Sequence, residues 1–339
     1  MKEGGEEKCS IIIPFRNEEE NLPSLFQSLK EQNFSKDKFE ILLVDDHSAD
    51  NGGVLALAFA DENPSINITL LRNQDQGGKK RAIALGLSKA KNDLILQTDA
   101  DCIVPKNWIK QMQYPFKNIE ITAVIGRVEM KSTGKFWSNL MALEFVSLQA
   151  SGIGLALMKV PVMSNAANLA YRKSQIPNNI GGENWETGDD AFLIQTLSKR
   201  NNNSVTVSLH SKVISKVPNT LCEFFNQRLR WGSKTPDYPL KQGKWIAVLV
   251  FLLSLCQILL LPLSFFHSPY WIVLACIYLF KILPDFLLLK TYLNNENQKS
   301  LLKWMPILAL FYPFYIVVTA LYILFASGSL KWKGRSIRR

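Results

Sequence analysis

The stretch "ILQTDADC" (residues 95–102) runs from apolar residues straight into two carboxylates, Asp99 and Asp101, with Ala100 between them. Turn-forming Asp residues often end a strand, and this ordinary role fits the stretch when it is read alone. Carboxylates at positions i and i+2 of a strand-to-loop junction can also face one hard divalent cation, which prefers oxygen ligands and is often shared with substrate phosphates. The rest of the chain has to decide between these two interpretations.

Short apolar runs bounded by turn residues recur before this stretch. They predict four strands, over residues 9–13, 39–45, 66–72 and 93–99. Apolar residues at helical spacing lie between the strands, for example at Leu22, Leu25 and Leu29. Strands that alternate with helices predict an α/β fold with a mostly parallel sheet whose faces are covered by helices.

Carboxylates stand repeatedly where these predicted strands end. The first strand leads into "PFRNEEE" (14–20), the second ends at Asp45 and Asp46, and the fourth ends at Asp99 and Asp101. Ligands of parallel sheets bind at the carboxyl ends of the strands, so these side chains are expected to share one polar site. No GxGxxG follows any of the strands, which argues against a dinucleotide fold.

The last third of the chain has a different character. Three apolar runs, residues 245–266, 270–289 and 304–328, are each long enough to cross a bilayer of about 30 Å. We therefore expect a multi-pass membrane protein with a transmembrane region of about three helices at 243–328 and a basic C-terminal tail at 329–339. Residues 134–158 are also apolar, but Glu144 would be costly in mid-bilayer, so this segment is predicted to be an interfacial helix.

The net charge of +10 does not indicate nucleic acid, because no zinc-finger, basic-zipper or RNA-binding signature accompanies it. Basic residues gather beside the apolar runs, where anionic lipid attracts them, so the membrane is the expected partner. The five cysteines show no metal-binding spacing and fit a reduced cytoplasmic compartment better than a disulfide framework.

Two motifs at helix starts indicate chemistry. Lys79 and Lys80 follow two glycines and open a helix, where their charge opposes the helix dipole, which favours a site for a phosphate-bearing ligand. Asp189 and Asp190 stand at the start of another helix, where carboxylates are stabilised, and either could act as a general base. Ordinary helix capping and a solvated basic face remain open as alternatives.

Six motifs, in this order, resemble the catalytic domain of the family 2 glycosyltransferases, which are inverting enzymes with a GT-A (nucleotide-diphospho-sugar transferase) fold. They are "SIIIPFRNEEENL" (10–22), "VDDHSADN" (44–51), "GGKKRAI" (77–83), "TDADC" (98–102), "TGDDAFL" (187–193) and "QRLRW" (227–231). The resemblance covers residues 8–235, predicted to be the catalytic domain. The membrane-associated branch of the family also carries C-terminal spanning helices and a QxxRW motif.

The resemblance implies a role for each motif. Asp99 and Asp101 match the DxD motif that binds a divalent cation, Mg²⁺ or Mn²⁺. Asp99 is also expected to bind the donor. The donor nucleotide is expected near Asp45 and Asp46, with Pro14 and Arg16 in the same pocket. Lys79 and Arg228 are also expected to bind the donor.

The resemblance also points to the catalytic groups. Asp190 is the expected base, although relatives often carry Glu where this chain has Asp189, so the choice stays open. The motif residues Gln227, Arg230 and Trp231 are expected at the diphosphate and the acceptor. Trp231 beside a membrane can equally be an interfacial anchor.

The sequence thus predicts a membrane-bound inverting glycosyltransferase that moves one sugar from a nucleotide-sugar, here a UDP-sugar, to a lipid or lipid-linked glycan acceptor. A processive polysaccharide synthase is the nearest alternative, and three spans are few for threading a polymer. A more distant alternative is a nucleotide-binding scaffold or transporter without turnover, favoured by the intramembrane pair Lys281 and Asp285.

Membrane topology gives two conflicting signals. The catalytic domain is expected on the cytoplasmic side of the cell membrane, so three spans would place the C-terminus outside. The tail carries five basic residues, which the positive-inside bias keeps in the cytoplasm. We predict a cytoplasmic C-terminus, with the second or third apolar run re-entrant or broken at its prolines.

Overall fold

The computed structural model describes residues 7–74, 77–177, 189–294, 298–325, 330–332 and 335–337. The chain divides into two compact units. Unit 1 comprises Met1–Glu129 and Gly152–Lys216, and unit 2 comprises Met130–Ser151 and Val217–Arg339. The QRLRW motif, expected inside the catalytic domain, therefore belongs to unit 2.

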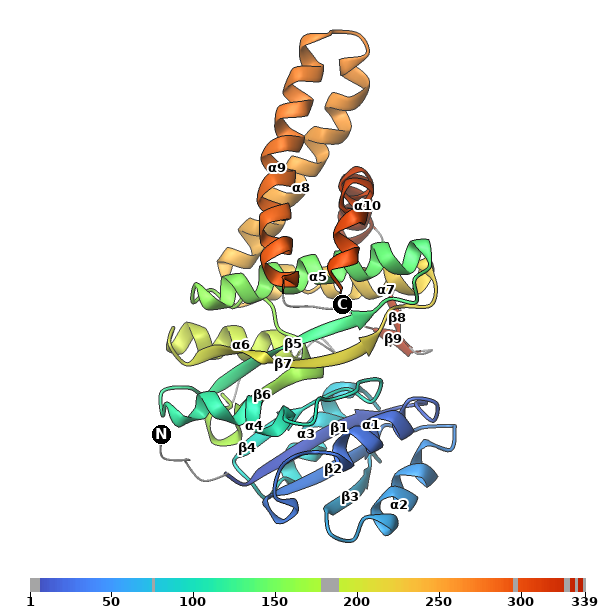
Figure 1. Ribbon diagram of the computed structural model, residues 1–339, viewed down its shortest axis with the longest axis vertical. Coiled ribbons are helices and arrows are strands. Elements are labelled where there is room, and N and C mark those ends of the chain that lie inside the picture. Colours follow the sequence, from blue (N-terminus) through green and yellow to red (C-terminus); the bar gives the residue numbers. More distant parts are fainter. Residues whose placement is uncertain are drawn as a thin grey trace. The chain divides into compact units, whose positions relative to one another are not determined.

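A seven-stranded sheet with the order β3-β2-β1-β4-β6-β5-β7 forms the framework of unit 1 (Figure 1). Its strands are β1 (Cys9–Phe15), β2 (Phe39–Asp45), β3 (Asn67–Arg72), β4 (Leu94–Gln97), β5 (Ala123–Lys131), β6 (Leu169–Arg172) and β7 (Val205–Lys216). The first four strands are parallel, whereas β6 runs antiparallel to both β4 and β5. The predicted α/β fold with a mostly parallel sheet is confirmed, and β1 to β4 match the four predicted strands.

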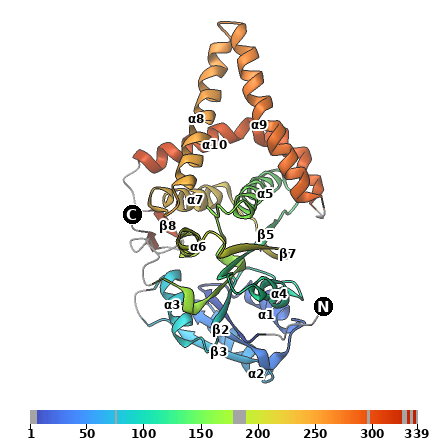
Figure 2. The same ribbon diagram turned by 90° about the vertical axis from the view of Figure 1, so that its left-hand side faces the viewer.

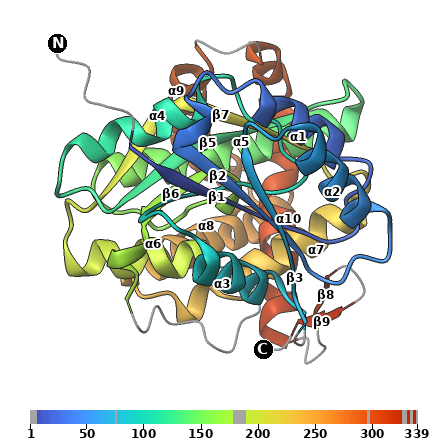
Figure 3. The same ribbon diagram turned by 90° about the horizontal axis from the view of Figure 1, so that it is seen from below.

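Helices cover both faces of the parallel strands, which is why these strands read as continuous apolar runs. The helices of unit 1 are α1 (Leu22–Lys30), α2 (Gly52–Glu62), α3 (Lys79–Lys89), α4 (Trp108–Gln113) and α6 (Asp189–Arg200), and the short 3₁₀ turns are η1 (Lys36–Lys38), η2 (Tyr114–Lys117), η3 (Ala166–Asn168) and η4 (Lys173–Gln175). Figure 3 shows α1 and α2 on one side of β1 and β2, and α3 on the other. A Cβ on Gly86 of α3 would lie 2.7 Å from Ile12 Cγ2, which shows how closely α3 packs on β1.

The buried side chain of Asn168 connects the antiparallel half of the sheet. Its Oδ1 accepts a hydrogen bond from Trp108 Nε1 in α4 at 2.9 Å. Its Nδ2 donates to the carbonyl oxygens of Arg127 in β5 at 2.8 Å and of Ser211 in β7 at 3.2 Å. Gly126 makes this approach possible, because a Cβ there would lie 2.2 Å from the Asn168 amide.

Unit 2 is built from long helices. They are the first part of α5 (Phe136–Leu157), α7 (Leu221–Gly232), α8 (Lys241–Ser264), α9 (Pro269–Leu293) and α10 (Met305–Phe325), with the 3₁₀ turns η5 (Thr235–Asp237) and η6 (Lys299–Trp304) and a small hairpin of β8 (Leu330–Trp332) and β9 (Arg335–Ile337). Four helical segments are long and apolar enough to span a membrane by length and composition: α5, α8, α9 and Lys299–Phe325. The last three match the predicted apolar runs.

Strand pairing excludes a single membrane crossing by α5. The helix connects β5 to β6, and these strands are hydrogen-bonded neighbours in one sheet. The chain before and after α5 must therefore lie on the same side of a membrane. In addition, 61% of the most apolar window of α5 is buried in the protein, against 11% for α8 and for α9. The interfacial location predicted for residues 134–158 is compatible with both observations.

The helices α8 and α9 lie side by side as a hairpin, and α10 runs crosswise to it (Figure 1 and Figure 2). Pro284 lies inside α9 and Pro313 inside α10, and both helices continue through these residues. The expectation of a break at the prolines is therefore wrong. Lys281 and Asp285, one turn apart on α9, pair with each other at 2.7 Å.

Gly126→Ala should destabilise the protein, because the added methyl group has to displace the fully bonded Asn168 amide. We expect the thermal midpoint of the purified protein to fall by about 5–10 °C. Gly154→Ala is the matched control, because a Cβ at this position in α5 meets nothing within 4 Å. Its midpoint should stay unchanged or rise slightly, since alanine favours a helix. Equal midpoints for the two variants would contradict the role given to Asn168.

Candidate functional site

The loops that follow β1 and β2 are tied together at the carboxyl edge of the sheet. Asn17 and His47 both adopt left-handed backbone conformations, with φ of 53° and 61°. Asn17 Oδ1 accepts a hydrogen bond from the backbone N–H of Ala49 at 2.8 Å, and Ser48 Oγ accepts from that of Asn17 at 3.1 Å. The two loops thus form one rigid rim beside the predicted nucleotide pocket. Such left-handed residues persist only where their surroundings fix them.

Asp45 and Asp46 end β2 beside this rim, and both take part in internal contacts. Asp45 Oδ1 accepts from the backbone N–H of Ser48 at 2.9 Å. Asp46 is 3% exposed, and it accepts from the backbone N–H of Gly78 at 2.9 Å and from Asn73 Nδ2 at 3.0 Å. Asp46 therefore holds the glycine that precedes α3, a role that the sequence did not reveal. Its role toward a nucleotide stays a prediction.

The remaining residues predicted for the nucleotide pocket also lie at this edge. Pro14 is buried within β1, and Arg16 follows the strand with a half-buried side chain. Next to them, a surface depression of about 410 Å³ is lined by residues 17–21, Ala49 and Asp50. Carboxylates dominate this lining, so the depression itself is unsuited to a phosphate group.

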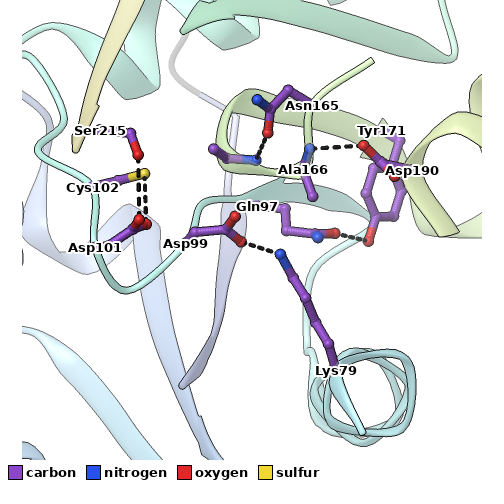
Figure 4. A network of polar contacts seen from close by, with 11 residues as sticks. Lys79, Gln97, Asp99, Asp101, Cys102, Asn165, Ala166, Tyr171, Asp190 and Ser215 are labelled. Carbon is purple, nitrogen blue, oxygen red and sulfur yellow. Dashed lines mark hydrogen bonds and ion pairs between the residues drawn. The ribbon is translucent and has the colours of Figure 1, made fainter. Parts of the chain in front are cut away.

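The carboxylates of "TDADC" lie just beyond β4 and point in different directions (Figure 4). Asp99 Oδ1 pairs with Lys79 Nζ, from the first turn of α3, at 2.5 Å. Asp101 instead accepts from Ser215 Oγ at 3.3 Å and from Cys102 Sγ at 3.5 Å. The side chains of Lys79 and Asp99 are 19% and 27% exposed, so a ligand can reach both.

The carboxyl group of Asp101 carries an electrostatic cost. Burial raises its pKa above the usual range, and the charges of Asp99 and Glu18 raise it further. Among the described residues, the positive charge of Lys79 lowers the pKa of Asp101. The negative charge of the two neighbouring carboxylates is thus only partly compensated within the described part of the chain.

This donor set fits a divalent cation that is shared with a substrate. Two carboxylates are hard oxygen ligands of the kind that Mg²⁺ and Mn²⁺ prefer. Within the described residues, no group of three or more His, Cys, Asp and Glu side chains is placed to hold a metal. An ion at Asp99 and Asp101 would therefore need further oxygen ligands from a diphosphate and from water.

Asp190 lies in the first turn of α6, and its Oδ2 accepts from the backbone N–H of Ala166 at 3.0 Å (Figure 4). Ala166 begins η3, directly before β6, and the start of β6 pairs with the end of β4. The topology thus brings Asp190 to the same edge of the sheet as Asp99. The side chain of Asp189 lies outside the described residues, so the comparison of the two carboxylates stays open.

The QRLRW motif lies on α7 in unit 2, where Arg228 has a structural environment. Arg228 is 3% exposed and Glu144 of α5 is 2% exposed, and their side chains form an ion pair. Arg228 Nε donates to both carboxylate oxygens at 3.1 Å, and Tyr315 of α10 donates its hydroxyl to Glu144 at 3.3 Å. Although burial alone would lower the pKa of Arg228, the charge of Glu144 raises it.

These contacts assign Arg228 to the interior of unit 2. Its guanidinium also stacks on Trp231, with 4.6 Å between the guanidinium carbon and the ring centroid, and it pairs with Gln227. The donor-binding role expected for Arg228 does not fit this burial, and we propose a structural role instead. Arg230 and Trp231 are half-buried, and the catalytic roles expected of them and of Gln227 stay predictions.

Comparisons with known proteins agree with this architecture. A mannosyltransferase from Pyrobaculum calidifontis, whose structure was solved with GDP-Man and Mn²⁺, has a similar fold, with a TM-score of 0.54 and 16% identity over 94% of this chain and 88% of that one. In sequence, the chain is 38% identical over 106 residues to an undecaprenyl-phosphate 4-deoxy-4-formamido-L-arabinose transferase of Yersinia enterocolitica, which is 31% of this chain and 32% of that protein.

A second relative is the glycosyltransferase GlyG of Streptococcus pneumoniae, 28% identical over 141 residues, which is 41% of this chain and 46% of that protein. The matches thus cover 32% and 46% of the length of these curated relatives. The family model described as glycosyl transferase family 2 matches residues 10–182, just over half of the chain. The chain therefore belongs to glycosyl transferase family 2.

Proposed function

We propose that this glycosyltransferase moves one sugar from a UDP-sugar to a lipid or lipid-linked acceptor presented at the membrane, with inversion at the sugar carbon. The observation that carries the proposal is the arrangement at the end of β4. Asp99 and Asp101 stand there with Lys79 at 2.5 Å from Asp99. The topology of the sheet brings Asp190 to the same edge.

Asp99 and Asp101 would hold a divalent cation, Mg²⁺ or Mn²⁺, together with the diphosphate of the donor. When bound, such an ion neutralises the charge that develops on the leaving diphosphate. Lys79 lies in the first turn of α3 and adds a second positive charge on the same side of Asp99. The rigid rim after β1 and β2 receives the nucleoside, which leaves the sugar at the end of β4.

Asp190 removes the proton from the attacking acceptor hydroxyl. Its Oδ2 accepts a hydrogen bond from the backbone N–H of Ala166, which orients the carboxylate at this edge of the sheet. An inverting displacement needs such a base on the face of the sugar opposite the leaving group. The position of Asp190 across from the Asp99 side of the site in Figure 4 supports this role.

A glycan linked to a polyprenyl lipid carrier, which offers a hydroxyl group to Asp190, is the acceptor class that we favour. The name of the Yersinia relative, undecaprenyl-phosphate 4-deoxy-4-formamido-L-arabinose transferase, contains a polyprenyl lipid of this kind. The apolar helices α8 and α9 provide the membrane attachment that such an acceptor requires.

The helix directions and the basic tail support the membrane arrangement that we propose. The hairpin of α8 and α9 crosses the cell membrane twice, and α10, which runs crosswise to it, does not cross (Figure 2). Both the catalytic domain and the C-terminus then lie on the cytoplasmic side, where nucleotide-sugars are made. This arrangement satisfies the positive-inside bias of the tail, because an even number of crossings returns the chain to the cytoplasm.

Asp101→Asn should abolish transfer and the stabilisation by Mn²⁺ plus UDP, yet the metal-free protein should be at least as stable as the wild type. The pKa of Asp101 is raised in the folded state, so its ionisation costs stability as the pH rises through that pKa, and asparagine removes this cost. Thermal unfolding at neutral pH with and without Mn²⁺ and UDP measures both effects.

The exposed carboxylate Asp61 gives a matched control, since Asp61→Asn should leave both midpoints unchanged. In the wild type, the stabilisation by Mn²⁺ should fade on acidification, because protons compete with the ion for a carboxylate with a raised pKa. Full Mn²⁺-dependent stabilisation of Asp101→Asn would contradict the assignment of this residue.

Asp190→Asn should reduce transfer by about 100-fold or more, because an amide cannot accept the proton of the acceptor hydroxyl. Binding of UDP with Mn²⁺ should stay close to that of the wild type, as measured by calorimetry. Asp189→Asn serves as the neighbouring control. An inactive Asp189→Asn next to an active Asp190→Asn would move the base by one position.

A cysteine introduced at Ser336, on a background without native cysteines, should resist an impermeant thiol reagent in intact cells and react after the cells are opened. This outcome is expected because the tail is cytoplasmic in the proposed arrangement. A cysteine in the connection between α8 and α9, at Ser268, should react in intact cells and controls for the reagent. Labelling at Ser336 in intact cells would mean that α10 crosses the membrane.

A further inference from the structure

A small cavity lies in unit 1 between α3, α6 and the ends of β4 and β6. Its volume is about 120 Å³. Apolar side chains form most of its walls, among them Ile83 and Leu87 of α3, Leu169 of β6 and Leu193 of α6, and the polar and charged residues that line it are Lys80, Gln97, Tyr171 and Asp190. A cavity of about 150 Å³ holds one benzene molecule, so this one has room for about five non-hydrogen atoms.

Gln97 brings an incompletely bonded amide to this cavity. Its side chain is 1% exposed, and its Oε1 accepts from the Tyr171 hydroxyl at 3.2 Å (Figure 4). Among the residues that the structure describes, Gln97 Nε2 has no hydrogen-bond partner. If the amide were turned over, Nε2 would reach Tyr171 and Oε1 would be left unpaired instead. A buried polar atom without a partner is costly, and a ligand in the cavity would remove that cost.

We propose that this cavity is the specificity pocket for the donor sugar, and that it takes the N-acyl substituent of an amino-sugar, whose carbonyl oxygen accepts from Gln97 Nε2. The inference rests on the proposed function, because it assumes that a nucleotide-sugar is held at Asp99. An N-acyl group fits in size, its carbonyl matches the donor that Gln97 Nε2 offers within the described residues, and its alkyl part suits the apolar walls. A hydroxyl would leave these walls unfilled, and a strongly hydrated phosphate would be costly against walls that are mostly apolar, although Lys80 is among the residues that line them.

The donor sugar, rather than the acceptor, is the part of the substrates that can reach the cavity. Gln97 is the last residue of β4 and precedes Asp99 by two residues, roughly 7 Å along an extended chain. A sugar attached to a diphosphate at Asp99 is therefore next to the cavity. The acceptor hydroxyl approaches from the Asp190 side, where that carboxylate needs to remain accessible.

The test compares the binding of two donors that differ in one substituent. UDP-N-acetylglucosamine and UDP-glucose carry an acetamido group and a hydroxyl group at the same carbon. We would measure their dissociation constants by calorimetry on the full chain in lipid nanodiscs, with Mn²⁺ and without acceptor. The wild type should bind the N-acetyl donor about tenfold more tightly, as expected for one buried hydrogen bond and its apolar contacts.

Gln97→Leu should remove this preference and leave the affinity for UDP unchanged. Gln97→Met, which has a similar shape and carries no hydrogen-bond donor, should act in the same way and replaces the leucine variant if that variant fails to fold. Thr98→Val is the matched control. Thr98 is the fully buried neighbour on the same chain segment, but it does not line the cavity. This variant should keep the preference.

Equal affinities of the wild type for the two donors, or an unchanged preference in both Gln97 variants, would overturn the specificity pocket. Failure of the wild type to bind UDP with Mn²⁺ would instead contradict the proposed function itself. If the wild type binds UDP but shows no preference between the two donors, the specificity pocket is contradicted and the proposed function is not.

Discussion

Two carboxylates that lie two residues apart at the end of a buried strand repel each other, and they lose much of their hydration there. The raised pKa of Asp101 is the direct sign of this cost. A sheet that places them at its carboxyl edge needs positive charge at the same edge. Lys79 supplies part of it from the first turn of α3, against the helix dipole. In our proposal the rest arrives with the substrate, as a divalent cation that accompanies the donor diphosphate.

Unit 2 also contains buried charges, but there the protein itself compensates them. Glu144 and Arg228 are both almost fully buried, and they compensate each other through a bidentate contact to which the Tyr315 hydroxyl adds a further hydrogen bond. Removing one partner of such a pair leaves a buried charge without compensation, which is strongly destabilising. The pair connects α5, α7 and α10. It also explains why a charged residue is tolerated within the apolar sequence of α5.

Much of the catalytic half was predictable, because its signals are local. The runs that became β1 to β4 are apolar on both faces, and parallel strands bring the carboxylates that follow them to one edge. The QRLRW motif was recognised, but the burial of Arg228 was not, because its partner Glu144 lies 84 residues away in the chain. Gln97 also escaped notice. Its importance comes from the cavity beside it, which residues of α3, α6 and the sheet line together.

The direction of α10 could not be predicted either. Its composition is that of a spanning helix, and only its crosswise course relative to α8 and α9 separates it from them (Figure 2). For α5 the distinction comes from topology, since β5 and β6 pair across it. Apolar length alone therefore does not determine the number of crossings, because length carries no information on which partners bury the helix.

The most direct test of the central claim is a crystal structure of the protein with UDP and Mn²⁺, with data collected at the manganese absorption edge. Our account predicts an anomalous peak bound by Asp101 and the UDP diphosphate, with Asp99 beside it. A peak at another place, or UDP bound in this site with no metal peak at Asp99 and Asp101, would contradict it.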